Sequence, residues 1–473
     1  MENTSVERII RIREAQKAYF ASGATLSIDF RRHMLTKLLD AMTKWEDRLS
    51  EALWKDLHKS YEEAYLTELS IVKAEIKAHI RNVARWARRR KASTPIKLFP
   101  SHSHIVKEPL GNALIISPWN YPVQLLLNPL VGAISAGCTA VLKPSPYVPD
   151  VSRTIEDMIA ETFDEKYIAV VQGNRQVNTA LLDERWDLIF FTGSPSLAKT
   201  VMTAAAKNLT PVVLELGGKS PCIIDETADI RTAAKRIAWG KTLNSGQTCI
   251  APDYILIHKN IKEQFVKAFA EEITNLHGTD IKADRHYVRM VNDKAFERVT
   301  GYFKDGDIIY GGQCDSDTRF IEPTLIGNVP LDSPLMTEEI FGPVFPLIEI
   351  DGDGRICGSD TDPKGSFRDA VIDFVNSREK PLAFYYFGKE SDGWDVIRRT
   401  SSGGGCINDV IMHIANENVP FGGVGNSGMG RYHDKESFEA FSHTRSIITT
   451  GTWIDLPFRY MPYKLFSLAK KIL

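Results

Sequence analysis

The order of hydrophobic and polar positions divides the chain into segments of different character. Residues 5–90 carry apolar side chains at three- and four-residue spacings with charges between them, which predicts amphipathic helices almost throughout. Ser27 and Asp29 could cap one of these helices, and residues 67–90 are expected to form another long one. The alternating positions around residues 97–107 then favour short strands.

From Gly111 onward, short apolar runs alternate with helical segments. Strands are expected at residues 113–117, 139–143, 168–171 and 188–191, and helices at 122–137 and 151–163. A second run of this kind begins near Pro221 and continues to about Pro420. Because apolar strands separated by helices predict a parallel sheet covered on both faces, we expect an α/β fold with two parallel-sheet domains.

Composition narrows the class of protein. A chain of 473 residues is long enough for two or three domains. Its 58 basic and 60 acidic residues give a net charge of −2, which indicates no nucleic-acid or strongly acidic partner. No apolar run reaches the roughly 18 residues needed to cross a bilayer. The polar N-terminus predicts neither a secretory signal nor a transit peptide.

The cysteines favour a reducing compartment, which we take to be the cytoplasm. They are scattered along the chain, with no CxxC motif and no spacing to histidine that would predict a metal site. The six are Cys138, Cys222, Cys249, Cys314, Cys357 and Cys406.

One carboxylate and one of these thiols stand in glycine-rich segments. Glu215 lies in Pro211–Pro221, which also contains Gly217 and Gly218, and Cys249 ends the segment Asn244–Cys249. A thiol nucleophile with a carboxylate that holds a water suggests covalent catalysis followed by hydrolysis. The alternative is that Cys249 is a buried packing residue and Glu215 a surface charge.

Two further segments follow expected strands, where α/β proteins build their sites. At Phe191–Lys199 a strand leads through Gly193 into a helix, a junction that can bind a pyrophosphate, although the GxGxxG signature is absent. At Ser117–Pro122 the chain carries Asn120 between two aromatic residues. Its amide could donate a hydrogen bond to a developing oxyanion.

The chain resembles the aldehyde dehydrogenase superfamily, and most closely its class 3 branch for fatty and aromatic aldehydes. The resemblance runs from about residue 10 to 450 and rests on seven motifs in order. They are Ser117–Pro122, Leu142–Ser145, Phe191–Gly193, Leu214–Lys219, Asn244–Cys249, Glu338–Pro343 and Pro420–Gly430.

The resemblance assigns roles to individual residues. It implies that Cys249 is the nucleophile, Glu215 the general base, and Asn120 an oxyanion donor together with the Cys249 N–H. It implies Tyr121 and Trp239 as walls of the aldehyde pocket. The residues implied to bind NAD or NADP are Trp119, Lys143, Gly193, Ser194, Leu216, Glu339 and Phe341.

The resemblance also implies a domain division and a partner. Residues 1–91 and 108–214 would form a Rossmann-like cofactor domain with a helical N-terminal part, and 215–420 the catalytic domain. Residues 92–107 and 430–455 would form a strand-rich bridging element that joins a homodimer. The tail at 456–473 is expected to pack on its own subunit or on a partner, with weak membrane-surface association as the alternative.

Two departures from the family pattern concern the cofactor. Relatives usually place glutamate, which binds both hydroxyls of the adenine ribose, where this chain has Pro146, so we expect NADP to be used at least comparably with NAD. Relatives often carry a second glycine within the segment 194–198, where Pro195 has no N–H to offer. The loop at 351–365 looks longer than in close relatives, without a functional account.

Two other functions are compatible with the same fold. A CoA-acylating dehydrogenase would transfer the acyl group to CoA instead of water, but such relatives generally lack the base that Glu215 would supply. A catalytically silent binding or structural protein is the other alternative. The presence of Cys249, Glu215 and Asn120 argues against it.

Overall fold

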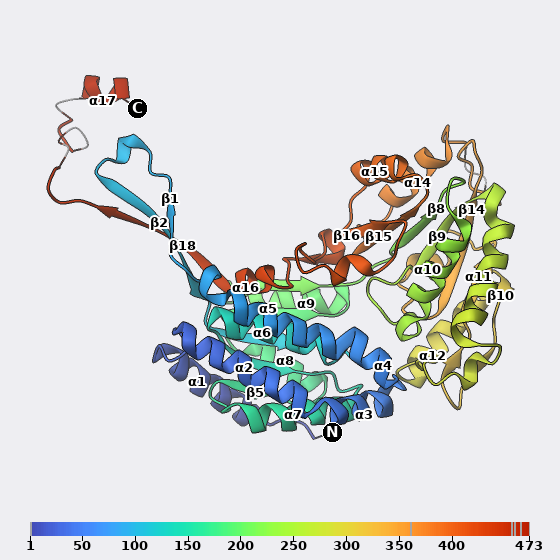
Figure 1. Cartoon of the computed structure of the whole chain (residues 1–473), viewed down its shortest axis with the longest axis horizontal. Helices are drawn as coiled ribbons and strands as arrows, with labels where there is room; N and C mark the ends of the chain where they lie inside the picture. Colours follow the sequence, from blue (N-terminus) through green and yellow to red (C-terminus); the bar gives the residue numbers. More distant parts are fainter. Residues whose placement is uncertain (1, 360–361, 456, 458–459, 464–465, 473) are drawn as a thin grey trace.

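Two large β-sheets organise the computed structural model of the chain (Figure 1). The structure describes residues 2–359, 362–455, 457, 460–463 and 466–472. The loop expected at 351–365 and the tail expected at 456–473 therefore lie partly outside the described residues.

The first sheet has the strand order β17-β7-β6-β3-β4-β5, with parallel neighbours except at β17. Every residue of β3, β4 and β6 is buried, which explains why these strands are unbroken apolar runs in the sequence. The strands are β3 (Asn112–Ile116), β4 (Thr139–Lys143), β5 (Ile168–Val170), β6 (Leu188–Thr192), β7 (Val212–Glu215) and β17 (Gly428–Met429).

Helices cover both faces of this sheet because successive strand residues point to opposite sides. One face packs on α1 (Val6–Ala21), α8 (Arg175–Asp183) and α9 (Pro195–Ala206). The other face packs on α2 (Ile28–Lys44), α3 (Glu46–Leu57), α5 (Ser70–Trp86), α6 (Gln124–Ala136) and α7 (Pro149–Thr162). The Ser27 side chain accepts a hydrogen bond from the Phe30 N–H and caps α2, as expected.

Several sequence-based boundaries were wrong. The helix expected over 67–90 differs at both ends: α4 (Tyr61–Ala64) leads into a π-helical turn at Tyr65–Leu69, α5 begins only at Ser70 and ends at Trp86, and Arg90 already belongs to a strand. The strand expected from residue 97 begins later, as β2 (Ser101–Pro109). Pro100 directly precedes it and has no N–H to donate to a ladder.

The second sheet has the order β10-β13-β14-β9-β8-β15-β16 and is parallel except between β10 and β13. Its strands are β8 (Pro221–Ile224), β9 (Tyr254–His258), β10 (Asp307–Tyr310), β13 (Thr324–Gly327), β14 (Val344–Ile350), β15 (Ala383–Phe387) and β16 (Gly404–Ile407). The helices α10 (Ile230–Thr242) and α11 (Lys262–His277) cover one face, and α12 (Asp293–Thr300), α14 (Phe367–Asn376) and α15 (Glu390–Arg399) cover the other.

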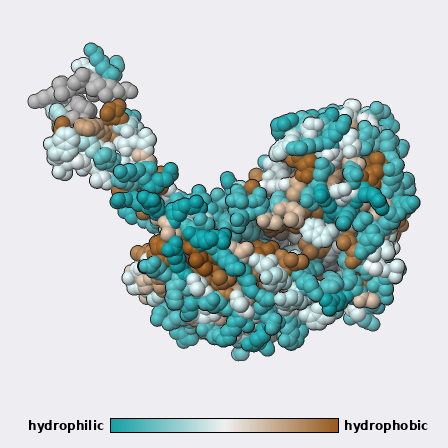
Figure 2. Space-filling model, viewed as in Figure 1, coloured by the Kyte–Doolittle hydropathy of each residue, from teal (hydrophilic) through white to brown (hydrophobic). Residues whose placement is uncertain are grey.

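A narrow arm projects from the body of the molecule, as Figures 1 and 2 show. It consists of β1 (Arg90–Ala92), β2 and β18 (Ser442–Thr450), with β18 antiparallel to β2 along nine residue pairs. The remaining elements are the β11 (Cys314–Asp315) and β12 (Phe320–Ile321) hairpin, α13 (Pro334–Thr337), α16 (Lys435–Ala440) and α17 (Phe466–Ile472).

These observations confirm the expected fold class, an α/β protein with two mainly parallel sheets and a separate strand-rich element. The domain boundaries stay a prediction. None of the helices in the described parts of the chain combines the length and apolar character that a bilayer span requires.

Candidate active site

The segment before Cys249 has an unusual backbone. Asn244, Ser245 and Gly246 all have positive φ angles, of 50°, 53° and 70°. A Cβ atom on Gly246 would lie 2.3 Å from the Gly342 carbonyl oxygen, so only glycine fits there. The turn leaves Cys249 half-buried, where it borders two separate cavities.

Glu215 meets Cys249 although 34 residues separate them in the chain. The carboxylate stands at the last residue of β7, opposite Gly428 of β17. Both of its oxygen atoms are buried and accept no hydrogen bond of ordinary geometry from the described residues. Burial raises the pKa of Glu215 to about 8, while the nearby Cys249 thiol lowers it and the charge of Glu339 raises it.

Burial also raises the pKa of the Cys249 thiol well above its usual range. The negative charges of Glu215 and Glu339 act in the same direction. The thiol therefore stays protonated at neutral pH and needs a base before it can act as a nucleophile.

Asn120 lies beside the same thiol on the cavity that Glu215 borders. Its side-chain N–H group donates to the Gln247 carbonyl at 3.0 Å, which turns the amide toward the Cys249 turn. An amide nitrogen carries two hydrogens, so one remains for a ligand. The Asn120 carbonyl in turn accepts a hydrogen bond of 2.9 Å from the Asn244 side chain.

The cavity that Glu215 borders has a volume of about 270 Å³. Six of the seven residues expected to bind cofactor line it, namely Trp119, Gly193, Ser194, Leu216, Glu339 and Phe341. The Trp119 and Phe341 rings meet edge to face, with centroids 5.4 Å apart. At Gly193 and Ser194 the cavity reaches the start of α9, whose positive end favours an anion, although Pro195 has no N–H and the Ser194 hydroxyl already accepts from the Leu197 N–H.

Lys143, the seventh expected cofactor residue, does not line this cavity. Its buried ammonium group donates to the Pro144 carbonyl at 2.7 Å. Burial lowers the pKa of Lys143 to about 8. The group has three N–H donors, and this is its one acceptor within the described part of the chain, so a ribose hydroxyl would satisfy another.

Glu339 is held against the glycines of the Leu214–Lys219 motif. Its carboxylate accepts from the Gly218 N–H at 3.1 Å, and a Cβ atom on Gly217 would lie 2.1 Å from that carboxylate. Burial raises the pKa of Glu339 to about 7. Lys219 pairs with Asp253 and donates to the Glu338 carbonyl at 2.8 Å, which fixes the neighbouring backbone.

The second cavity that Cys249 borders has a volume of about 530 Å³ and a mainly apolar lining. Tyr121 and Trp239 both line it, as expected for an aldehyde pocket. The Tyr121 hydroxyl is paired with the Thr248 hydroxyl at 2.7 Å, so the ring presents an apolar face. The apolar residues around them include Leu66, Ile71, Leu125, Leu243, Leu276, Ile411, Met412, Ile414 and Phe421.

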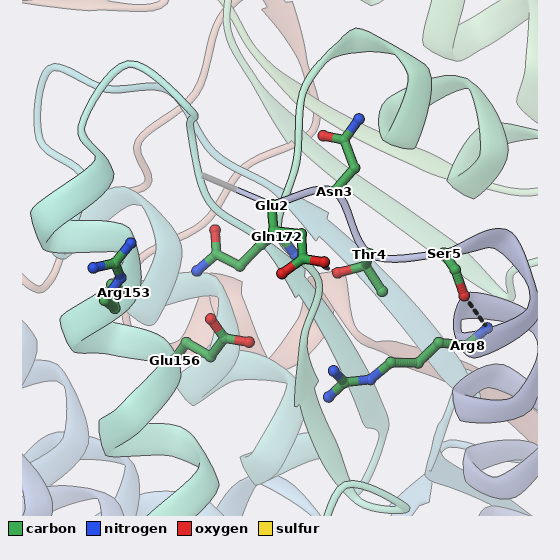
Figure 3. A pocket seen from close by; sticks show the side chains of 8 residues that line it. All are labelled: Glu2, Asn3, Thr4, Ser5, Arg8, Arg153, Glu156 and Gln172. Atoms are coloured by element: carbon green, nitrogen blue, oxygen red, sulfur yellow. Dashed lines mark hydrogen bonds between the residues drawn. The ribbon is translucent and has the colours of Figure 1, made fainter.

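Two other hollows lie away from these residues. Figure 3 shows a polar hollow of about 460 Å³ where Arg8 of α1 faces Arg153 and Glu156 of α7. A larger one of about 1210 Å³, between the end of α5 and the arm, is lined mostly by basic residues. The described residues contain no cluster of histidine, cysteine and acidic side chains suited to a metal ion.

Comparison with known proteins decides the family. The sequence pattern described as the aldehyde dehydrogenase family matches residues 1–447. The chain belongs to the aldehyde dehydrogenase family.

Curated relatives of this aldehyde dehydrogenase match it over almost their whole length. A 4,4'-diaponeurosporen-aldehyde dehydrogenase of Staphylococcus aureus is 44% identical and covers 95% of both chains. The dimeric NADP-preferring aldehyde dehydrogenase of the dog, Canis lupus familiaris, is 41% identical and covers 98% of this chain and 99% of its own. Human aldehyde dehydrogenase family 3 member B1 is 42% identical over 93% of this chain and 90% of its own.

A solved structure agrees with the fold of this dehydrogenase. The substrate-bound state of Staphylococcus aureus AldH superposes with a TM-score of 0.93 at 43% identity, over 98% of this chain and 99% of that one. Members of the family use NAD or NADP. One of the two cavities at Cys249 therefore has to accommodate this cofactor.

The sequence did not point to several residues that surround the site. Arg298 lines the smaller cavity and donates to the carbonyl oxygens of Glu339 and Ile340. Glu63 and Tyr432 line the larger one. These residues come from segments with ordinary helical or polar patterns, so no local signal could have identified them.

Proposed function

We propose that the enzyme oxidises an aldehyde to its carboxylic acid through a covalent intermediate on Cys249. The observation that carries this proposal is the position of the thiol between two cavities. One cavity is apolar and suits the aldehyde chain, whereas the other has the residues expected for the cofactor.

The first step would be attack of the Cys249 sulfur on the carbonyl carbon. Because the thiol pKa is raised, Glu215 would accept its proton. The negative oxygen of the resulting thiohemiacetal would bind to the Asn120 amide and the Cys249 N–H. Losing one such donor typically costs about 3 to 4 kcal/mol in the transition state.

The residues around the smaller cavity fit a nicotinamide dinucleotide. The start of α9 would hold the pyrophosphate, Glu339 the nicotinamide ribose, and Trp119 and Phe341 the ring. NAD or NADP, when bound, accepts the hydride that the thiohemiacetal loses. Cys249 would then carry a thioester.

Once the proton taken from the thiol has passed to solvent, Glu215 would act as the base that activates a water, and the sulfur released from the thioester would take up a proton and restore the thiol. A buried carboxyl with a pKa of about 8 is well matched to proton transfer near neutral pH. This residue also favours hydrolysis over the alternative, acyl transfer to CoA, and the three intact chemical residues oppose a silent protein.

The substitution test of this mechanism uses the thiol. The Cys249→Ser variant is expected to lose at least about 1000-fold in kcat while keeping the Tm of wild type, because an alcohol is a much weaker nucleophile. Cys138→Ser, at a buried cysteine that lines neither of the two cavities at Cys249, is the matched control for activity. Turnover that survives in Cys249→Ser would refute the nucleophile.

Cofactor choice is proposed from Pro146, which stands where relatives have the ribose-binding glutamate. NADP should be used at least comparably with NAD, in line with the name of the canine relative, which describes it as NADP-preferring. Steady-state kinetics with each cofactor tests this. A preference for NAD above about 100-fold, or about 2.7 kcal/mol, would reject it.

The substrate is proposed to be a medium- or long-chain aliphatic aldehyde or an aromatic one. The apolar lining of the larger cavity supports this, and one relative is a 4,4'-diaponeurosporen-aldehyde dehydrogenase. Values of kcat/KM for short, medium and long aliphatic aldehydes and benzaldehyde, each with both cofactors, discriminate among these classes.

We also propose two properties of the whole protein. A homodimer is proposed from the arm and from the dimeric canine relative. A cytoplasmic location is proposed from the six scattered cysteines, none of which forms a disulfide in the structure.

A further inference from the structure

Three ionisable side chains lie close together next to the active site and have no part in the reaction described so far. Lys59, Glu63 and Glu68 belong to one short stretch at the start of α4 and the π-helical turn. The Lys59 ammonium lies 2.7 Å from a Glu68 oxygen, and both side chains are 0% exposed. A buried ion pair of this kind is a weak contributor to stability, since desolvation offsets the attraction.

This ion pair contacts the loop that contains Asn120. Lys59 donates to the Asn120 carbonyl at 3.2 Å. The second Glu68 oxygen accepts from the Val123 N–H at 2.8 Å and from the Gln124 N–H at 3.2 Å. The pair therefore holds the backbone of residues 120–124 at both ends.

Glu63 extends these contacts to the turn before Cys249. One of its oxygens accepts from the Asn244 N–H at 2.9 Å. Asn244 itself donates to the Asn120 carbonyl, so the two loops and the 59–68 stretch form one connected set of hydrogen bonds. The loop that carries the oxyanion donor Asn120 and the turn that precedes the nucleophile Cys249 are therefore both hydrogen-bonded to the 59–68 stretch.

The local helix geometry brings the two carboxylates to these positions. Glu68 lies within the π-helical turn Tyr65–Leu69, whose wider winding departs from the regular helix on either side. Turns of this type are rare and frequent at functional sites. A stretch serving only to continue a helix into α5 would not need the change in winding.

We infer that Lys59 and Glu68 are positioning residues that set the place of the Asn120 amide relative to the Cys249 sulfur. This inference rests on the proposed function. A displacement of about 1 Å at a catalytic donor can cost about 100-fold in rate, so the ion pair would act on acylation while leaving the thiol itself intact.

Two reactions of Cys249 separate this role from a general structural one. Acylation by an aldehyde passes through an oxyanion, whereas alkylation by iodoacetamide does not. In Lys59→Met and Glu68→Gln, the rate at which reduced cofactor forms in the first turnover is expected to fall by about 10- to 100-fold. Absorbance of the reduced cofactor measures this rate. The rate of iodoacetamide alkylation is expected to stay within about twofold of wild type.

A matched control breaks another ion pair between the same residue types. Lys262 lies 2.6 Å from Glu349, and both side chains are 20% exposed, beside the second sheet. Lys262→Met should leave both reactions of Cys249 unchanged. The Tm of each variant reports folding, and Glu68→Gln, which keeps the shape of the side chain, serves if Lys59→Met does not fold.

Each outcome bears on the inference. Acylation that slows in Glu68→Gln while alkylation holds supports it. Acylation at the wild-type rate, or acylation and alkylation that slow together, overturns it. If the wild-type enzyme gives no acyl-enzyme with any aldehyde, the proposed function fails instead, and that result comes from wild type alone.

Discussion

At the residue scale, the chemistry depends on two acidic groups whose protons are hard to remove. Glu215 and Cys249 share a buried site, where ionisation of either makes ionisation of the other less favourable. Burial is the main reason that the pKa of each group is raised, and the charges of Glu215 and Glu339 raise the pKa of the thiol further. Glycine-rich segments single out both residues in the sequence, and the resemblance to the family assigned their roles, which stay a prediction.

The first prediction concerns release of the acid. If Glu215 is the hydrolytic base, the rate of thioester hydrolysis should rise with pH and level off above about pH 8, where the carboxyl is ionised. Glu215→Gln should remove this dependence and slow hydrolysis by about 100-fold or more, and reduced cofactor should also form more slowly in the first turnover, because the variant lacks the base that accepts the thiol proton. Stopped-flow absorbance over a pH series measures both; an unchanged profile in the variant would contradict the assignment.

The same carboxyl affects stability. Its folded pKa of about 8 lies above the ordinary value of 4.5, so the folded protein binds the proton more tightly, and stability falls as pH rises from 4.5 to about 8. Glu215→Gln cannot ionise and is expected to melt a few degrees above wild type near pH 9, but not near pH 4.5. Melting curves at both pH values check this, and a pH-independent difference would count against it.

At the element scale, the turn before Cys249 is the most constrained segment. Gly246→Ala would place a Cβ atom 2.3 Å from the Gly342 carbonyl at a φ of 70°. We expect a loss of about 2 kcal/mol or more in unfolding free energy and a large loss of kcat, measured by denaturant titration and steady-state kinetics. Gly301→Ala is the control, since its Cβ would meet nothing within 4 Å. Equal effects at the two positions would show that the turn is not constrained.

The helices and strands also show which features of the fold can be predicted from sequence patterns. Periodicity predicted the N-terminal helices and the buried strands, because one face or both faces of each element are apolar along the chain. It missed the π-helical turn and the late start of β2, which depend on packing and on Pro100. It could not predict that Lys59 and Glu68 are buried, because their partners at residues 120–124 are distant in sequence.

Lys143 shows a similar limit. The resemblance assigned it to the cofactor, yet its ammonium donates to Pro144 and lies outside the lining of the smaller cavity. A motif fixes which residue type stands at the end of a strand. It does not fix the conformation of a long side chain before its ligand is present.

At the scale of the whole molecule, the segments that connect to the strands of the arm leave apolar side chains in solvent, one between β1 and β2 and one just after β18. Ile96 is 82% exposed and Trp453 is 72% exposed. If a second copy covers them, Ile96→Glu with Trp453→Glu should convert the dimer to a monomer, because a buried interface does not tolerate unpaired charges. Leu209→Glu, at a body residue that is 90% exposed, is the control. Sedimentation velocity measures the state; a dimer that persists in the double variant would place the interface elsewhere.

The position of Cys249 between two cavities has a consequence for timing. Glu215 lines the smaller cavity and is not among the residues that line the larger one, so the water that it activates is expected to share the smaller cavity with the cofactor. Oxidation and hydrolysis therefore need the same volume at different moments, while the acyl chain stays in the other cavity. We expect a high concentration of reduced cofactor to delay release of the acid without competing with the aldehyde. The turnover rate would then depend on whether the reduced cofactor leaves before hydrolysis, and not only on how tightly the cofactor binds.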